Sequence, residues 1–461
     1  MVFSSLLFLF VFLPAVLLLY YVSPRRPRNA ILLAASLVFY AWGEPVYIAL
    51  MLFSTCTDYI FGLLLDRKDG QRKRRWVLGA SVAVNLSVLG FFKYADFAVG
   101  TVNGWFGTDI PLLELPLPIG ISFYTFQSMS YIFDVYRGHA KAQRSWLDFA
   151  AYVSLFPQLV AGPIVQYGTV AEQLKHRIVH NEMFAEGVRR FTVGLAKKVL
   201  LANNIGMLWA AVSESVDGPL PALAAWLGIV AFAFQIYFDF SGYSDMAIGL
   251  GLMFGFRFNE NFNKPYTAQS VTDFWRRWHI SLGSWFREYV YIPLGGNRRG
   301  LAVQLRNIGV VWALTGLWHG ASWNFVLWGL YFGVILMLEK IVLLRRLQQW
   351  PRWIRHMYAL LLVLLGWVLF AFESPAEIGA YLSAMSGLNG AGLWDRPTLY
   401  LLYTNAVLLA ILVLASLPWR GGKLHRRWPA ALGPFAHAAL FLLSVAYLVD
   451  ATFNPFLYFR F

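Results

Sequence analysis

FWRRWHISLGSWFREYVYIPLGGNRR occupies residues 274–299 and is followed, at residues 315–324, by TGLWHGASWN. The first stretch is aromatic and basic, and it contains His279. The second contains His319 and lies in a run, residues 308–338, that has no Asp, Glu, Lys or Arg. An ionisable side chain within such a run is costly to bury in lipid, and it therefore marks a candidate functional site.

The whole chain has the composition of a membrane protein. Of its 461 residues, 58% are hydrophobic and 13% are charged, and the mean hydropathy is +0.55. Soluble domains carry about 25% charged residues, and many apolar segments here could cross ~30 Å of hydrocarbon. The sequence predicts an all-α polytopic membrane protein, a single membrane-embedded domain over residues 1–461. Hydropathy gives about 11–12 transmembrane helices, and the proline-containing block at residues 146–168 predicts a re-entrant segment.

The net charge of +14 is concentrated in short loops between apolar segments. Basic loops at residues 66–75 and 345–355 are expected on the cytoplasmic side, and acidic loops at 96–116 and 373–398 on the outer side. This arrangement explains the charge without nucleic acid, so we expect a multi-pass protein of the cell inner membrane and no nucleic-acid partner. The single cysteine, Cys56, excludes an intrachain disulfide and a cysteine metal cluster.

Residues 271–291 have the pattern of one amphipathic helix lying at the membrane interface. Ser270 followed by Asp273 is typical of a helix start. The apolar stripe consists of Phe274, Trp278, Leu282, Trp285 and Tyr289. His279 is expected at the edge of this stripe, facing the polar side, where it is either a site residue or a headgroup-facing histidine on an anchor helix.

His319 has glycine on either side of the WH pair, at Gly316 and Gly320. Small residues let another backbone approach or leave room for a substrate chain. A neutral imidazole suits general-base chemistry because its ordinary pKa, about 6.5, is close to operating pH. The alternative is a core histidine bonded to a neighbouring carbonyl oxygen.

Two aspartates, Asp239 and Asp245, lie within an apolar segment, where each costs about 2.5–3.5 kcal/mol on insertion scales. They are expected to face a polar cavity or to pair with a basic residue of the core. The loop at residues 291–300, rich in glycine and arginine, could hold a phosphate or could be an ordinary cytoplasmic loop. The candidate substrate-binding residues are Trp275, Arg276, Arg277, Asp239, Asp245, Trp318, Arg298 and Arg299.

Motifs of several enzyme classes are missing. The sequence has no HExxH, no GxSxG and no Cys/His zinc spacing. Metal-dependent chemistry and a serine hydrolase of the soluble type are therefore disfavoured, and no metal site is predicted.

WRRWHISL at residues 275–282 and GLWHG at residues 316–320 resemble the membrane-bound O-acyltransferase (MBOAT) family, in its branch that modifies bacterial polysaccharides. The segments at residues 117–138, 237–258 and 292–298 and the C-terminal FLYFRF share the resemblance, which covers essentially the whole chain. It implies a ring of helices around a central funnel. It also implies that His319 is the principal catalytic residue and that His279 is the second active-site residue.

With these residues, the resemblance implies a membrane O-acetyltransferase that acetylates, or passes acetyl groups across the membrane for, an exported polysaccharide such as alginate. The resemblance implies acetyl-CoA or another acyl thioester as donor and no bound cofactor. The expected partners are membrane lipid, a periplasmic acetyltransferase or other polysaccharide-modification protein, and the polysaccharide acceptor. Two alternatives remain open: a D-alanyl or lipid acyltransferase of the same family, and a transporter or flippase without chemistry.

Overall fold

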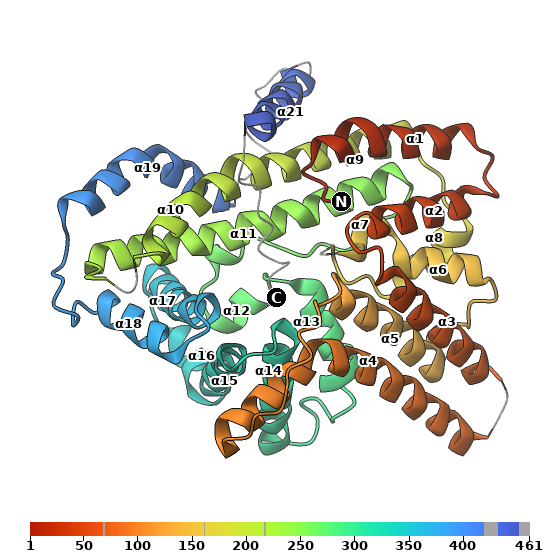
Figure 1. The fold of residues 1–461 in the computed structure, drawn as a ribbon, viewed down its shortest axis with the longest axis horizontal. Coiled ribbons are helices and arrows are strands. Elements are labelled where there is room, and N and C mark those ends of the chain that lie inside the picture. The colour runs from red at the N-terminus through yellow and green to blue at the C-terminus, as the bar shows by residue number, and fades with distance from the viewer. Residues whose placement is uncertain (68–69, 161, 216–217, 419–431, 451–461) are drawn as a thin grey trace. The chain divides into compact units, whose positions relative to one another are not determined.

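The computed structural model describes residues 1–67, 70–160, 162–215, 218–418 and 432–450. Every regular element in these ranges is a helix, so the all-α fold is confirmed (Figure 1). The chain divides into two compact units, Met1–Phe191 with Tyr243–Glu260, and Thr192–Gly242 with Asn261–Phe461. A single membrane-embedded domain and a central funnel remain predictions, and FLYFRF, residues 456–461, lies outside the described residues.

The first unit begins at the N-terminus of the chain. Its helices are η1 (Phe8–Phe12), α1 (Leu13–Val22), α2 (Arg28–Ala41), α3 (Ile48–Leu65), α4 (Gln71–Phe106), α5 (Ile121–Arg137), α6 (Trp146–Ser154), α7 (Phe156–Leu159), α8 (Tyr167–Lys175) and most of α9 (Asn181–Ala196). The C-terminal end of α11 (Ala222–Met253) also belongs to it.

The packing of α3, α4 and α5 shows how this unit accommodates polar groups in apolar helices. Gly62 on α3 is a close approach, since a Cβ there would lie 2.2 Å from the hydroxyl oxygen of Tyr131 on α5. Asp58 is fully buried, and its Oδ1 accepts hydrogen bonds from Ser81 Oγ at 2.9 Å and Asn85 Nδ2 at 2.8 Å. A carboxyl group at such a depth requires these donors.

The block predicted to be re-entrant is broken into the short helices α6, α7 and α8. Leu155 has non-helical backbone and separates α6 from α7, whose four residues, Phe156–Leu159, are all buried. Gln158 Nε2 donates to the carbonyl oxygen of Tyr152 at 2.7 Å, so side chains replace part of the missing helical hydrogen bonding. The break is confirmed, and re-entry into the membrane remains a prediction.

The second unit holds both stretches that opened the sequence. Its helices are η2 (Lys197–Ala202), α10 (Asn203–Ser213), most of α11, η3 (Pro265–Thr267), α12 (Val271–Trp275), α13 (Ile280–Phe286), η4 (Arg287–Tyr291), α14 (Leu301–His319), α15 (Trp323–Leu338), η5 (Glu339–Leu343), α16 (Leu344–Leu347), α17 (Arg352–Ala371), α18 (Pro375–Met385), α19 (Arg396–Ser416) and α21 (Leu432–Asp450).

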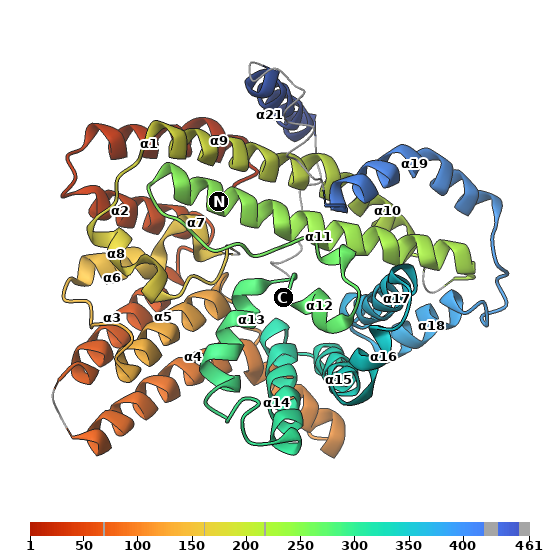
Figure 2. The same ribbon diagram turned by 180° about the vertical axis from the view of Figure 1, so that it is seen from behind.

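Helices α14 and α15 form a tight hairpin, and they lie side by side in both views (Figure 2). Glycines bring their backbones together: a Cβ at Gly316 would lie 2.4 Å from the carbonyl oxygen of Phe325, and one at Gly329 would lie 2.5 Å from that of Trp312. The prediction that small residues next to His319 admit another backbone is therefore confirmed.

Seven helices of the described residues are long and apolar enough to cross a membrane, namely α3, α4, α11, Trp323–Leu347, α17, α19 and Gly433–Asp450. Two shorter apolar helices are Phe8–Val22 and Arg28–Ala41. These candidates are selected by length and composition alone, so the expected 11–12 membrane crossings remain a prediction. The apolar segment at residues 117–136, for example, forms α5, which has 17 residues and ends in Arg137.

Candidate active site

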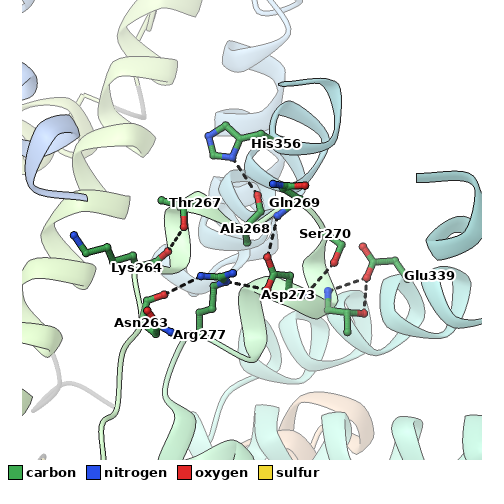
Figure 3. Close-up of polar contacts among 11 residues, drawn as sticks. Asn263, Lys264, Thr267, Ala268, Gln269, Ser270, Asp273, Arg277, Glu339 and His356 are labelled. Carbon is green, nitrogen blue, oxygen red and sulfur yellow. Dashed lines mark hydrogen bonds and ion pairs between the residues drawn. The ribbon is translucent and has the colours of Figure 1, made fainter. Parts of the chain in front are cut away.

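The first part of the site is the start of α12, which is capped as the sequence predicts. Ser270 Oγ accepts a hydrogen bond from the Asp273 backbone N–H at 3.0 Å. Asp273 Oδ2 accepts from the backbone N–H of Gln269 at 3.2 Å, and its Oδ1 pairs with Arg277 Nε at 2.8 Å (Figure 3). Part of the charge of Arg277 is therefore used within α12 and the turn that follows it.

Glu339, at the end of α15, holds the same helix start from the other side. Its carboxylate, drawn in Figure 3, faces the helix start. It accepts hydrogen bonds from Val271 N and Thr272 N, both at 2.8 Å, and from Thr272 Oγ1 at 2.5 Å. Glu339 is fully buried. A carboxylate at the N-terminus of a helix satisfies backbone donors that the helix itself cannot satisfy.

His279 lies at a break in the helix and is buried. The prediction of one continuous helix over residues 271–291 is wrong, because α12 ends at Trp275 and α13 begins at Ile280, with His279 between them at φ +46°. The expected polar-facing position is also wrong, since His279 is only 3% exposed. The apolar stripe that includes Phe274 and Leu282 is buried within the protein, whereas the interfacial helix predicted from the sequence would have turned this stripe toward the membrane.

Asn261 explains the break. Its backbone carbonyl oxygen accepts from Ile280 N at 2.9 Å, and its Oδ1 accepts from Ser281 N at 3.1 Å and Ser281 Oγ at 2.9 Å. The same Oδ1 lies 3.2 Å from His279 Nδ1. A left-handed backbone at a residue other than glycine persists only where its surroundings impose it, and such residues concentrate at functional sites.

The environment of His279 keeps its imidazole neutral. The ring of Phe240 on α11 meets it edge-on with centroids 4.8 Å apart. Burial lowers the pKa of His279 from its ordinary value of 6.5 to about 3. At neutral pH the ring therefore acts as a hydrogen-bonding group and carries no charge.

His319 is the last residue of α14 and is 6% exposed. Its ring meets Trp328 of α15 with centroids 4.9 Å apart and Phe370 of α17 with centroids 5.3 Å apart, both edge-on. Gly320 ends the helix in extended backbone, and a Cβ there would collide with the ring of Phe325. The histidine is thus fixed between three helices at the turn of the hairpin.

The fold brings the two histidines together through an aromatic neighbour. Trp318 precedes His319, and its ring centroid lies 5.6 Å from that of His279. Trp275 at the end of α12 lies 5.3 Å from Trp328, which contacts His319. Both tryptophans named from the sequence, Trp275 and Trp318, therefore line the region around the histidines, and their role in substrate binding remains a prediction.

The two aspartates take part in ion pairs. Asp239 Oδ1 lies 2.6 Å from Lys198 Nζ, and both side chains are 3% exposed. Asp245 belongs to the other unit, where its Oδ1 lies 2.9 Å from Arg190 Nη2. Pairing with a basic residue, one of the two interpretations from the sequence, accounts for their burial. A role for either in substrate binding remains a prediction.

The arginines of the loop after η4 are exposed to solvent. Arg298 and Arg299 are exposed, as is Arg276 before His279. Gly295 and Gly296 have positive φ, and their N–H groups bond within the turn, to the carbonyl oxygens of Ile292 and Tyr291. These two N–H groups are therefore already in use, and a phosphate would meet the guanidinium groups instead. Donor binding by these arginines remains a prediction.

The sequence interpretation overlooked Asn261 and the role of Glu339. Glu339 could have been noticed in the sequence, because it is a carboxylate next to a long uncharged run. The run does not reveal which helix start the carboxylate binds. Asn261 had no signal, since asparagine is common in loops. In the described ranges, no group of three or more His, Cys, Asp or Glu side chains could hold a metal ion.

The chain is similar in sequence to known proteins. The family model of membrane-bound O-acyltransferases, MBOAT, matches residues 138–374, which include both histidines. The "Probable alginate O-acetylase AlgI" of Azotobacter vinelandii is 42% identical over 100% of both chains. The chain belongs to the MBOAT family.

Two relatives of lower identity have names that record a different polymer or a different transferred group. The "Peptidoglycan O-acetyltransferase" of Helicobacter pylori is 35% identical over 85% of this chain and 81% of its own. The "Teichoic acid D-alanyltransferase" of Bacillus subtilis is 28% identical over 53% of this chain and 67% of its own. Similarity is thus greater, and covers more of the chain, for relatives named as O-acetylating enzymes.

Proposed function

We propose that this protein is an inner-membrane O-acetyltransferase that acetylates an exported polysaccharide, with alginate as the first candidate, or passes acetyl groups across the membrane for it. The observation that carries the proposal is the full-length similarity, 42% identity, to a protein named as an alginate O-acetylase. Two buried histidines joined through Trp318 supply a place for the chemistry.

In the proposed reaction, the donor is an acyl thioester such as acetyl-CoA. His319 accepts the proton of an acceptor hydroxyl as the hydroxyl oxygen bonds to the thioester carbonyl carbon. The carbon–sulfur bond then breaks, and the leaving thiolate takes the proton from His319. A positioned base of this kind contributes about 10²–10⁴-fold to rate.

His279 suits orientation better than proton transfer. It is neutral, held beside Asn261, and separated from His319 by Trp318. Its proposed role is to position the donor or the acceptor. Trp275 and Trp318 would form the apolar wall around the acyl group.

The exposed arginines suit the anionic part of the donor. Arg276, Arg298 and Arg299 present guanidinium groups to solvent, and the fork of N–H donors in arginine matches phosphate geometry. Arg277 is already paired with Asp273, so its contribution would be smaller. The acceptor would be the polysaccharide or a periplasmic acetyltransferase that completes the transfer.

The test has two arms. Mass spectrometry of the secreted polymer, with and without this protein, should show loss of O-acetyl groups in its absence. Purified protein in detergent should release coenzyme A from [¹⁴C]acetyl-CoA in the presence of acceptor. Loss of D-alanine esters, or of acetyl groups from peptidoglycan alone, would contradict the polysaccharide assignment, and transport without thioester turnover would contradict the chemistry.

A further inference from the structure

Two buried hydrogen-bond donors on α15 have no partner in the described part of the chain. They are the side-chain amide nitrogen of Asn324 and the indole nitrogen of Trp328. Asn324 is 1% exposed and Trp328 is fully buried. Both belong to α15, directly after the turn that follows His319.

The helix places these donors on one face. Asn324 and Trp328 are four residues apart, so their side chains project from the same side of α15, one turn from each other. That side of α15 faces His319, because the ring of Trp328 meets the ring of His319 edge-on with centroids 4.9 Å apart. Asn324 therefore lies on the side of α15 that faces the proposed base.

The amide of Asn324 is oriented by its neighbour. Ser322 Oγ donates a hydrogen bond to Asn324 Oδ1. Because the oxygen is engaged, the NH₂ group is the part of the side chain that is available to an incoming group. Ser322 thus fixes which end of the amide is presented.

An unsatisfied buried donor costs about 1–3 kcal/mol, and native structures rarely retain one without a reason. Two such donors on one helix face, next to a buried histidine, indicate that an acceptor atom arrives from outside the chain. Both donors are neutral N–H groups, which fit a carbonyl oxygen or an oxyanion and have no affinity for a cation. Donors already in place where negative charge develops are an effective means of rate enhancement.

We propose that Asn324 Nδ2, with Trp328 Nε1 as second donor, hydrogen-bonds the carbonyl oxygen of the acyl group during transfer. The proposal rests on the acyl-transfer function above. As the acceptor oxygen bonds to the carbonyl carbon, the carbonyl π electrons move to the oxygen, where the two N–H groups stabilise them. When the carbon–oxygen double bond re-forms, the carbon–sulfur bond breaks and the thiolate takes the proton held by His319.

The test compares Asn324→Leu and Trp328→Phe, which remove the donors and keep an apolar side chain or aromatic ring. The matched control is Trp312→Phe. Trp312 packs against Trp328 with centroids 5.8 Å apart, and no ring contact joins it to His319 among the described residues. The assay is steady-state turnover of [¹⁴C]acetyl-CoA by the purified full-length protein, beside its melting temperature in the same detergent.

Loss of one such donor typically costs about 10²–10³-fold in kcat. We expect that loss in Asn324→Leu, a smaller loss in Trp328→Phe, and a donor KM within about threefold of the parent protein. Melting temperatures should not fall, because an unsatisfied buried donor has been removed. Ser322→Ala should give an intermediate kcat, since the amide is then free to turn.

The outcomes separate this inference from the proposed function. If the parent protein neither consumes acetyl-CoA nor acetylates polymer in cells, the proposed function is overturned, and this inference with it. If the parent is active and Asn324→Leu keeps kcat within about threefold, the inference alone is wrong. A fall in kcat that matches a fall in melting temperature, or that Trp312→Phe reproduces, would assign Asn324 to packing and also overturn it.

Discussion

Replacing Glu339 should weaken both the fold and the reaction, because its carboxylate is the partner of three donors at the start of α12. In Glu339→Ala the backbone N–H groups of Val271 and Thr272 lose their acceptor in a buried position. At about 1–3 kcal/mol for each unsatisfied group, the expected loss of unfolding free energy is roughly 2–6 kcal/mol. Glu339→Gln keeps one acceptor oxygen and should lose about 1–3 kcal/mol.

The effect on activity follows from the site residues at and after the end of α12. Its last residue is Trp275, and His279 follows four residues later, so a loosened helix start displaces both. Misplacement by about 1 Å can cost on the order of 10²-fold in rate. We therefore expect both the melting temperature and the acyl-transfer rate to be highest in the parent protein, lower in Glu339→Gln and lowest in Glu339→Ala.

The assay is thermal unfolding of purified protein in detergent, followed by intrinsic tryptophan fluorescence, together with turnover of labelled acyl donor. Glu214→Ala is the control, because Glu214 is an exposed carboxylate at the end of α10, and surface substitutions usually change stability by less than about 0.5 kcal/mol. If Glu339→Ala melts at the temperature of the parent protein and keeps its activity, the carboxylate does not hold α12 as described.

Three further predictions concern charge. Either single variant of the buried pair, Lys198→Met or Asp239→Leu, should lose about 3–5 kcal/mol of unfolding free energy, because it leaves one charge buried without its partner. The double variant should regain most of the lost melting temperature. Additive losses in the double variant would contradict the ion pair. Arg298→Gln with Arg299→Gln should raise the donor KM more than it lowers kcat, whereas unchanged donor affinity would leave these residues with a role in topology only. Burial lowers the pKa of His279 to about 3, so the stability that its neutral ring contributes is complete above pH 6.5 and is lost as the pH falls toward 3. His279→Asn should therefore flatten the decline of melting temperature between pH 6.5 and pH 3. An unchanged decline would refute the lowered pKa of His279.

Local sequence patterns predicted the features that depend on neighbouring residues. Ser270 caps α12 through a residue three positions away, and the capping pattern is visible within that span. The stripe that includes Phe274, Trp278 and Leu282 is buried even though the helix is broken, because the break keeps the apolar side chains on the inner side. Periodicity therefore identified which side chains share the buried face.

Features that depend on distant residues could not be predicted in the same way. The position of His279 is set by Asn261, 18 residues earlier in the chain. The start of α12 is held by Glu339, which is 67 residues from Thr272. Helical periodicity carries no information about such partners, so the sequence predicted a continuous helix and placed His279 on its polar side. His319 could be singled out from the sequence because a histidine in an uncharged run is unusual by itself, and its catalytic role remains a prediction.

Replacement of His319 tests the central claim most directly. The measurement is the acetyl content of the secreted polymer in cells that carry His319→Ala, beside the melting temperature of the purified variant. His437→Ala is the control, because the hydrogen bond of His437 among the described residues stays within α21, with Nδ1 2.7 Å from the carbonyl oxygen of Gly433. We predict near-background acetylation by a His319→Ala protein that inserts and melts normally, since a general base contributes about 10²–10⁴-fold. Near-normal acetylation by a stable His319→Ala protein would contradict the account.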